Sequence, residues 1–205
     1  KGHRPVTNPL SRAFLCSRAD DCRIVRAPRI AFLSMPPDLI VVAASNGENL
    51  KLAERCVHAA SQRQAQAELI DLTVLSLPLY TPRVQAAGAG ADLISLRDRL
   101  HAAPRWMICA PEYNGSIPPV LSNAIAWLSV LDDDFRSLFN GRPIAIGTHS
   151  GGGGMEVLVS MRIQLTHLGA EVIGRQLLSN FSKPAKDESI DDVVKRLLQR
   201  QPLAL

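Results

Sequence analysis

Three polar loops in the sequence carry residue types that bind ligands. They are SNGEN at 45–49, PEYNGSIP at 111–118 and THSGGGG at 148–154. Each follows an apolar stretch. Their serine, asparagine and histidine side chains are hydrogen-bonding groups, and their glycines let the backbone approach a ligand closely. The residue types therefore predict a binding site for a polar ligand, built from loops.

The first loop, 45–49, stands at a predicted strand-to-helix junction. Free backbone N–H groups and the helix dipole make such a junction attractive to phosphate, and Ser45, Asn46 and Asn49 add polar side chains. The same residues would also serve as a turn and a helix cap, so both interpretations stay open. The sequence has neither GxxxxGK[ST] nor GxGxxG, which argues against a nucleotide triphosphatase loop and the dinucleotide fingerprint.

The second loop offers several groups to a flat ligand. Tyr113 supplies an aromatic face, Asn114 an amide, Gly115 room for close approach and Ser116 a hydroxyl. The two prolines that follow stiffen the chain, so the loop is expected to be pre-shaped. A planar heterocycle would suit it, although an ordinary connecting loop is the alternative.

The third loop has four consecutive glycines at 151–154, preceded by His149 and Ser150. Glycine lets the backbone come very close to a bound group. A flexible connection is the alternative, but it would waste chain entropy between a buried strand and a long helix. We expect His149 to bind a ligand rather than to act as an acid or base.

Apolar runs alternate with segments of helical periodicity along the chain. Strands are predicted at 38–45, 67–75, 105–110, 142–149 and 170–177, and helices at 48–64, 92–103, 122–131, 155–169 and 187–201. Strands that are apolar throughout have both faces covered. The pattern predicts an α/β fold, a doubly wound sandwich with a five-stranded parallel sheet. Ligands bind such sheets at the carboxyl ends of the strands, where all three loops would lie.

Composition narrows the choice of partners. The 205 residues carry a net charge of +4, which arises entirely within residues 1–38 because the remainder has 16 basic and 16 acidic residues. No basic helix face follows, so nucleic acid is not an expected partner. No apolar run approaches the roughly 20 residues of a membrane span. The four cysteines have the spacing of neither a metal site nor a redox pair, and a cytoplasmic location is expected.

The first part of the chain differs from the rest. Residues 1–38 contain five prolines and no sustained periodicity, so they are predicted to be a poorly ordered extension before a domain at 39–205. Our hypothesis is that residues 1–34 are a leader or a translated upstream stretch. A transit peptide is less favoured because Asp20 and Asp21 are acidic and no amphipathic pattern is present.

The stretch PEYNGSIPPVLSNAIAWLS resembles the central signature PEYNxSxPGxLKNAIDW of the NADPH-dependent FMN reductase family. The block MRIQLTHLGAEVI, after the glycine loop, is similar to a second family block. The resemblance implies a flavodoxin-like fold that binds FMN non-covalently and forms a homodimer or homotetramer. It also implies electron transfer from NADPH or NADH through FMN to free flavin, a quinone, an azo compound or a metal oxyanion.

The resemblance also assigns site residues by position. Loop 45–49 is similar to the phosphate loop GSxRxxSxN but is shorter and lacks its arginine and second serine, which leaves Ser45, Asn46, Asn49 and backbone N–H groups. The remaining matched residues lie in the other two loops. Pro111, Glu112, Tyr113, Asn114, Gly115 and Ser116 would lie along the flavin ring, and His149, Ser150, Gly151 and Gly152 near its pyrimidine edge.

Departures from the family pattern concern mainly the next helix, where Pro119, Ser122 and Ala126 replace Gly, Lys and Asp. This helix often makes the subunit contact in the family, so these changes bear on oligomerisation, and Trp127 is expected in core or interface packing. No catalytic side chain is predicted because the cofactor carries the hydride. A flavodoxin-like electron carrier and a non-enzymatic FMN-binding protein remain the alternatives.

Overall fold

The computed structural model describes residues 35–88 and 90–204. The described unit begins at Met35, so the proposed leader at 1–34 lies outside the described residues and stays a hypothesis. The boundary predicted between residues 38 and 39 is close to the point where the first strand begins, at Leu39.

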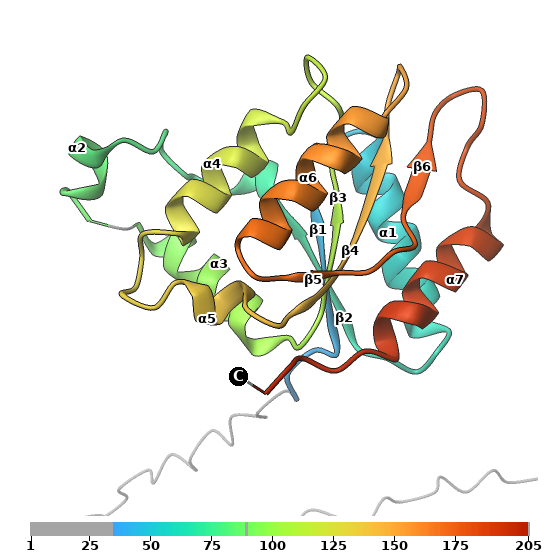
Figure 1. Cartoon of the computed structure of the whole chain (residues 1–205), viewed down its shortest axis with the longest axis horizontal. Helices are drawn as coiled ribbons and strands as arrows, with labels where there is room; N and C mark the ends of the chain where they lie inside the picture. Colours follow the sequence, from blue (N-terminus) through green and yellow to red (C-terminus); the bar gives the residue numbers. More distant parts are fainter. Residues whose placement is uncertain (1–34, 89, 205) are drawn as a thin grey trace, which may run out of the picture. The chain divides into compact units, whose positions relative to one another are not determined.

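A parallel sheet forms the centre of this unit (Figure 1). Its strands are β1 (Leu39–Ala43), β2 (Ala67–Asp71), β3 (Trp106–Cys109), β4 (Pro143–His149), β5 (Glu171–Val172) and β6 (Leu177–Ser179). The order is β2-β1-β3-β4-β5, with β6 also paired to β4, and every pairing is parallel. This is the strand order of flavodoxin-like sheets, and it confirms the predicted fold class.

Helices cover both faces of the sheet. They are α1 (Glu48–Ser61), α2 (Pro82–Gln85), α3 (Ala91–Ala102), α4 (Pro119–Leu128), α5 (Arg136–Phe139), α6 (Met155–His167) and α7 (Asp187–Leu198), with a 3-10 turn, η1 (Leu72–Val74). Successive residues of each strand pack against different helices, which gives one helical layer on each face of the sheet. Val41 packs in the apolar cluster with α1 and α7, whereas Val42 packs in the cluster with α3, α4 and α6, because successive side chains point to opposite faces.

The predicted fifth strand, 170–177, is two short strands in the structure. β5 pairs with the start of β4 and β6 with its end. Arg162 of α6 lies at the break between them and donates hydrogen bonds to the carbonyls of Val172 and Ile173 and to the side chain of Gln176. These bonds satisfy backbone groups that a continuous strand would have paired within the sheet.

The remaining elements lie close to their predicted positions. α4 begins at Pro119, in the first turn where proline is tolerated, and α6 ends two residues before Gly169, whose φ is +98°. The short helices α2 and α5 and the turn η1 were not predicted. Within the described residues, no helix has both the length and the apolar character to cross a membrane.

Candidate functional site

Three central strands bring the polar loops to one edge of the sheet. Ala43 of β1 is in register with Cys109 of β3, which is in register with Gly147 of β4. Two backbone hydrogen bonds extend this alignment, from Ala44 N–H to the Cys109 carbonyl at 2.9 Å and from Ala110 N–H to the Gly147 carbonyl at 3.0 Å. The loops after β3 and β4 project side by side at the top of Figure 1.

The loop at 45–49 leaves the start of α1 uncapped. Gly47 is the N-cap residue, and no side chain hydrogen-bonds to the first turn of the helix. Asn46 is exposed and Ser45 is partly exposed. An uncapped N-terminus presents free N–H groups. This junction therefore keeps the donors that an anion requires.

Asn49 has a different local environment from the other residues of this loop. Its side chain is only 2% exposed. Its Nδ2 donates to the carbonyl of His149 at 2.8 Å, and its Oδ1 accepts from the N–H of His149 at 2.8 Å. Asn49 thus joins the first loop to the third, and its side-chain oxygen is occupied within the protein.

Glu48 places a carboxylate at the first position of α1. Lys51 donates a 2.7 Å hydrogen bond to it. That bond is the main reason why the pKa of Glu48 lies below its ordinary value, and the nearby charge of His149 lowers the pKa slightly further. The pair leaves the start of α1 without an uncompensated negative charge.

The second loop is a two-residue hairpin. Asn114 and Gly115 have φ values of +52° and +69°, and Tyr113 and Ser116 exchange backbone hydrogen bonds of 3.1 and 3.0 Å. Positive φ at both central residues is the type I′ arrangement, which an Asn-Gly pair favours strongly. Tyr113, the residue just before the turn, is 52% exposed. The loop is thus pre-shaped, as predicted, although its Asn-Gly signal was not recognised as a hairpin.

Glu112 lies between the second and third loops. Its Oε2 atom is buried and has no hydrogen-bond partner among the described residues. Its Oε1 atom would be 4.0 Å from a Cβ placed at Gly152. Pro111 before it is buried. The carboxylate is therefore positioned at the contact between the two loops, with acceptor capacity left over.

The third loop is held at both ends. Ser150 is buried; its N–H donates to the carbonyl of Ser179 at 3.0 Å, and its Oγ accepts from the N–H of Gly152 at 3.1 Å. Gly154 is the N-cap of α6 with φ +75°, and a Cβ there would lie 2.9 Å from Leu178 Cδ1. Gly151, by contrast, has open space around its Cα.

His149 is anchored through one ring nitrogen only. Its Nδ1 lies 3.1 Å from the hydroxyl oxygen of Ser179, and Phe181 meets its ring edge-on at 4.8 Å between centroids. The Nε2 atom is buried and has no hydrogen-bond partner in the described part of the chain. A buried polar atom in this state requires an explanation.

Tyr80 and Trp127 join the segment after β2 to α4. Their rings meet edge-on at 5.3 Å, and the Trp127 indole N–H donates to the carbonyl of Pro78 at 2.7 Å. Trp127 is 1% exposed, so the predicted core packing is confirmed. The Tyr80 hydroxyl hydrogen-bonds to Gln85. Arg83, in the same segment, is exposed.

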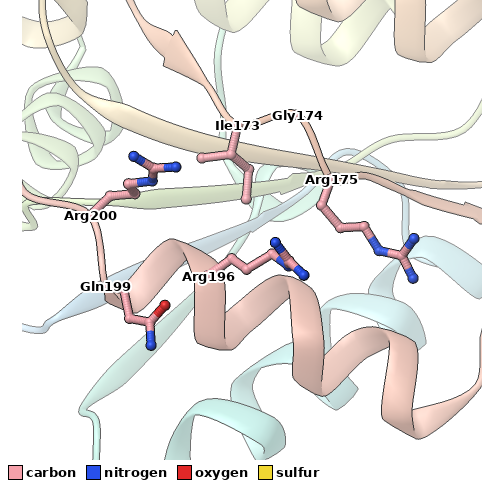
Figure 2. Close-up of a pocket in the computed structure, with 6 residues that line it drawn as sticks. All are labelled: Ile173, Gly174, Arg175, Arg196, Gln199 and Arg200. Atoms are coloured by element: carbon pink, nitrogen blue, oxygen red, sulfur yellow. The ribbon is translucent and has the colours of Figure 1, made fainter.

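A separate cleft of about 520 Å³ lies away from these loops, between the segment after β5 and the end of α7 (Figure 2). It is lined by Arg175, Arg196 and Arg200. Asp192 pairs with the first two, at 3.2 and 2.9 Å. Arginine in the last turn of α7 also complements the helix dipole. Local structure thus explains the charges of Arg175 and Arg196, and the cleft contains none of the predicted site residues.

The geometry of the three loops fits FMN. The uncapped start of α1 suits a phosphate. Open space at Gly47, Gly115 and Gly151 would allow a ligand to approach the backbone. Near these loops, the buried atoms Glu112 Oε2, Thr148 Oγ1 and His149 Nε2 have no partner within the described residues. These donors and acceptors match a ligand that has an anionic end and a polar ring.

Comparisons with known proteins agree with this arrangement. A model of the NADPH-dependent FMN reductase family matches residues 37–183. The quinone reductase of Escherichia coli (strain K12) is 34% identical over 127 residues, 58% of this chain and 66% of the relative. An NAD(P)H-dependent FMN reductase of Pseudomonas aeruginosa is 31% identical over 144 residues, 67% of this chain and 75% of the relative.

A solved structure, the flavoenzyme NAD(P)H:(acceptor) oxidoreductase FerB from Paracoccus denitrificans, matches with a TM-score of 0.59. Its identity is 20%, and the match covers 78% of this chain and 98% of that one. At this identity the likeness shows the fold alone. The family model matches residues 37–183, well over half of this chain. The chain therefore belongs to the NADPH-dependent FMN reductase family. The match to the quinone reductase spans just under two thirds of that relative's length.

Proposed function

We propose that this protein is an FMN-dependent oxidoreductase that passes electrons from NADPH or NADH to a small acceptor. The observation that carries the proposal is the convergence of an uncapped helix start, a type I′ hairpin and a glycine loop at one edge of the sheet. Family membership supports the same assignment. Free flavin, a quinone, an azo compound and a metal oxyanion are the acceptor classes, and the curated quinone reductase relative favours the quinone.

Each loop has a separate role in this proposal. Backbone N–H groups of 45–49, with Ser45 and Asn46, bind the phosphate. The residues along the ring are Pro111, Glu112, Tyr113, Asn114, Gly115 and Ser116. His149, Ser150, Gly151 and Gly152 complete the site from the third loop, and Asn49 fixes the first loop against the third.

When bound, FMN would supply the redox chemistry, since it takes a hydride from a nicotinamide and returns electrons to an acceptor. The chain's own residues would position the flavin. The paired backbone of Tyr113 and Ser116 holds the hairpin rigid, and the Tyr113 ring beside the turn is exposed. An exposed ring at this place is consistent with an open face at which nicotinamide and acceptor bind in turn.

We infer a homodimer or homotetramer, as is implied by the resemblance. Trp127 does not supply the contact surface, because its side chain is inside the fold. Exposed apolar residues on α6, namely Met155, Val159 and Ile163, stand four positions apart on one helix face, and they support a contact there. The free thiols of Cys56 and Cys109 are consistent with the cytoplasmic location that we propose.

The test is the visible spectrum of the purified full chain, recorded before and after anaerobic addition of NADPH and then of a quinone. We expect flavin bands that bleach with NADPH and recover with the quinone. Bands that persist with both NADPH and NADH would favour an electron carrier. Failure to take up added FMN would contradict the proposal and favour a non-enzymatic protein that retains only the fold.

A further inference from the structure

The proposed phosphate loop contains no cation. Residues 45–49 include neither Lys nor Arg, and their only charged residue is the acidic Glu48. Lys51, one turn further along α1, is 2.7 Å from the Glu48 carboxylate and is thus already paired. A phosphate at this junction would therefore need a side-chain donor from another element to supplement the backbone N–H groups.

His149 has the hydrogen-bonding state of such a donor. The Oγ atom of Ser179 accepts the N–H of Ala185 at 3.0 Å. Its other partner in the described part of the chain is Nδ1 of His149, at 3.1 Å. A serine hydroxyl has one hydrogen to donate and two lone pairs to accept with, so Ser179, which already accepts from Ala185, is able to donate to Nδ1. When it does so, the proton of a neutral imidazole resides on Nε2, the buried atom without a partner.

The position of the ring is defined by its neighbours. His149 follows Ala145 and Gly147 in alternation along β4, and Ala145 packs in the cluster with α1 and α7. The backbone of His149 is tied to Asn49 in the first turn of α1. The imidazole therefore lies on the face of the sheet that α1 covers, close to the first turn of that helix.

We propose that His149 Nε2 donates a hydrogen bond to the FMN phosphate, and that Ser179 is the positioning residue that keeps the proton on Nε2. The proposal rests on the FMN-binding function proposed above. It assigns His149 to the phosphate rather than to the pyrimidine edge of the ring. The proposal gives the buried donor a partner, and it supplies a side-chain donor that the loop at 45–49 does not provide.

The test compares FMN with riboflavin, which has the same ring and no phosphate. Dissociation constants are measured from flavin fluorescence with the flavin-free full chain. In the variant His149→Phe, which keeps the ring and its contact with Phe181, we expect FMN affinity to fall about tenfold. Riboflavin affinity should change less than about twofold. His149→Gln, which retains a side-chain N–H donor, should restore most of the FMN affinity.

Ser179→Ala is the second variant, and it should weaken FMN binding about threefold without affecting riboflavin. His58→Phe is the matched control, because His58 is exposed on α1 away from the loops; it should change neither constant. If His149→Phe is poorly folded by circular dichroism, His149→Ala replaces it. Equal losses for FMN and riboflavin, or no loss for either, would overturn the assignment of His149. Failure of the unchanged protein to bind FMN would overturn the proposed function as well.

Discussion

Asn49 and His149 lie 100 positions apart in the sequence, and the side chain of one binds the backbone of the other through two hydrogen bonds of 2.8 Å. The side-chain amide of Asn49 pairs with both the N–H and the carbonyl of His149. It thus makes the two hydrogen bonds that the backbone of a neighbouring strand would make. One buried side chain thereby joins the start of α1 to the end of β4. The relative position of two loops of the candidate site depends on this pair.

Asn49→Ala should therefore destabilise the fold strongly. It leaves two backbone groups of His149 without their partner, and each such loss costs about 1–3 kcal/mol, so the free energy of unfolding should fall by about 2–6 kcal/mol. Urea unfolding followed by circular dichroism measures this. Asn46→Ala is the control, because Asn46 is exposed. It should leave stability within about 0.5 kcal/mol while weakening FMN binding. Equal stability of the two variants would contradict the structural role of Asn49.

Gly154→Ala should destabilise the third loop. A Cβ at this position would lie 2.9 Å from Leu178 Cδ1 and 3.0 Å from Thr148 Cγ2, and the backbone has φ +75°. Left-handed backbone costs about 1–2 kcal/mol for a non-glycine residue, and overpacking adds about 1–3 kcal/mol. The melting temperature of the variant should fall clearly.

Gly151→Ala is the matched comparison for that substitution. Gly151 has no atom within 4 Å of an added Cβ, so the melting temperature should remain close to that of the unchanged protein. Its FMN affinity should nevertheless decrease, because a methyl group would occupy space where the proposed site needs close backbone approach. If Gly151→Ala retains full FMN affinity, Gly151 does not contact the cofactor.

Glu48→Gln should strengthen FMN binding. The substitution removes a carboxylate from the start of α1, where it opposes a bound phosphate, and it leaves Lys51 free to attract one. We expect FMN affinity to rise about two- to fivefold at low salt, and the gain should shrink at 0.5 M salt. Glu54→Gln, on the exposed side of the same helix, is the control and should have no effect. A gain that is independent of salt would argue against an electrostatic cause.

Tyr80 and Trp127 should show coupled contributions to stability. Their edge-on contact at 5.3 Å is of the kind worth about 0.5–1.5 kcal/mol beyond the buried area. A double-mutant cycle with Tyr80→Leu and Trp127→Leu, measured by urea unfolding, should return a coupling energy in that range. Strict additivity of the two single changes would show that the contact adds nothing specific.

Much of the fold could be predicted from the sequence, because apolar periodicity reports on burial. The fifth strand is the main difference. Residues 170–177 are predicted as one strand, but Gly174 interrupts it, and the polar pair Arg175 and Gln176 leads into β6. Arg162, on another element, satisfies the carbonyls at the break. A tertiary hydrogen bond of this kind has no local sequence signal.

The candidate site was also predictable in part, once the order of strands and helices was known. The rule that ligands bind at the carboxyl ends of parallel strands led to the three loops, and their register at one edge confirms that they converge. The Asn114–Gly115 pair was a readable hairpin signal. The pairing of Asn49 with His149 and the anchoring of His149 by Ser179 could not be read, because the partners lie 100 and 30 positions apart.

The separation of the three loops in sequence has a consequence for folding. β1, β3 and β4 must all be paired before their loops meet, and contacts between distant segments form slowly. No partly assembled chain would offer the complete site, so flavin would bind native molecules alone. A saturating ligand of this kind stabilises the native state by mass action, by about 2.7 kcal/mol at 100 times the dissociation constant. The flavin absorbance of a preparation would then be proportional to the amount of correctly folded protein in it.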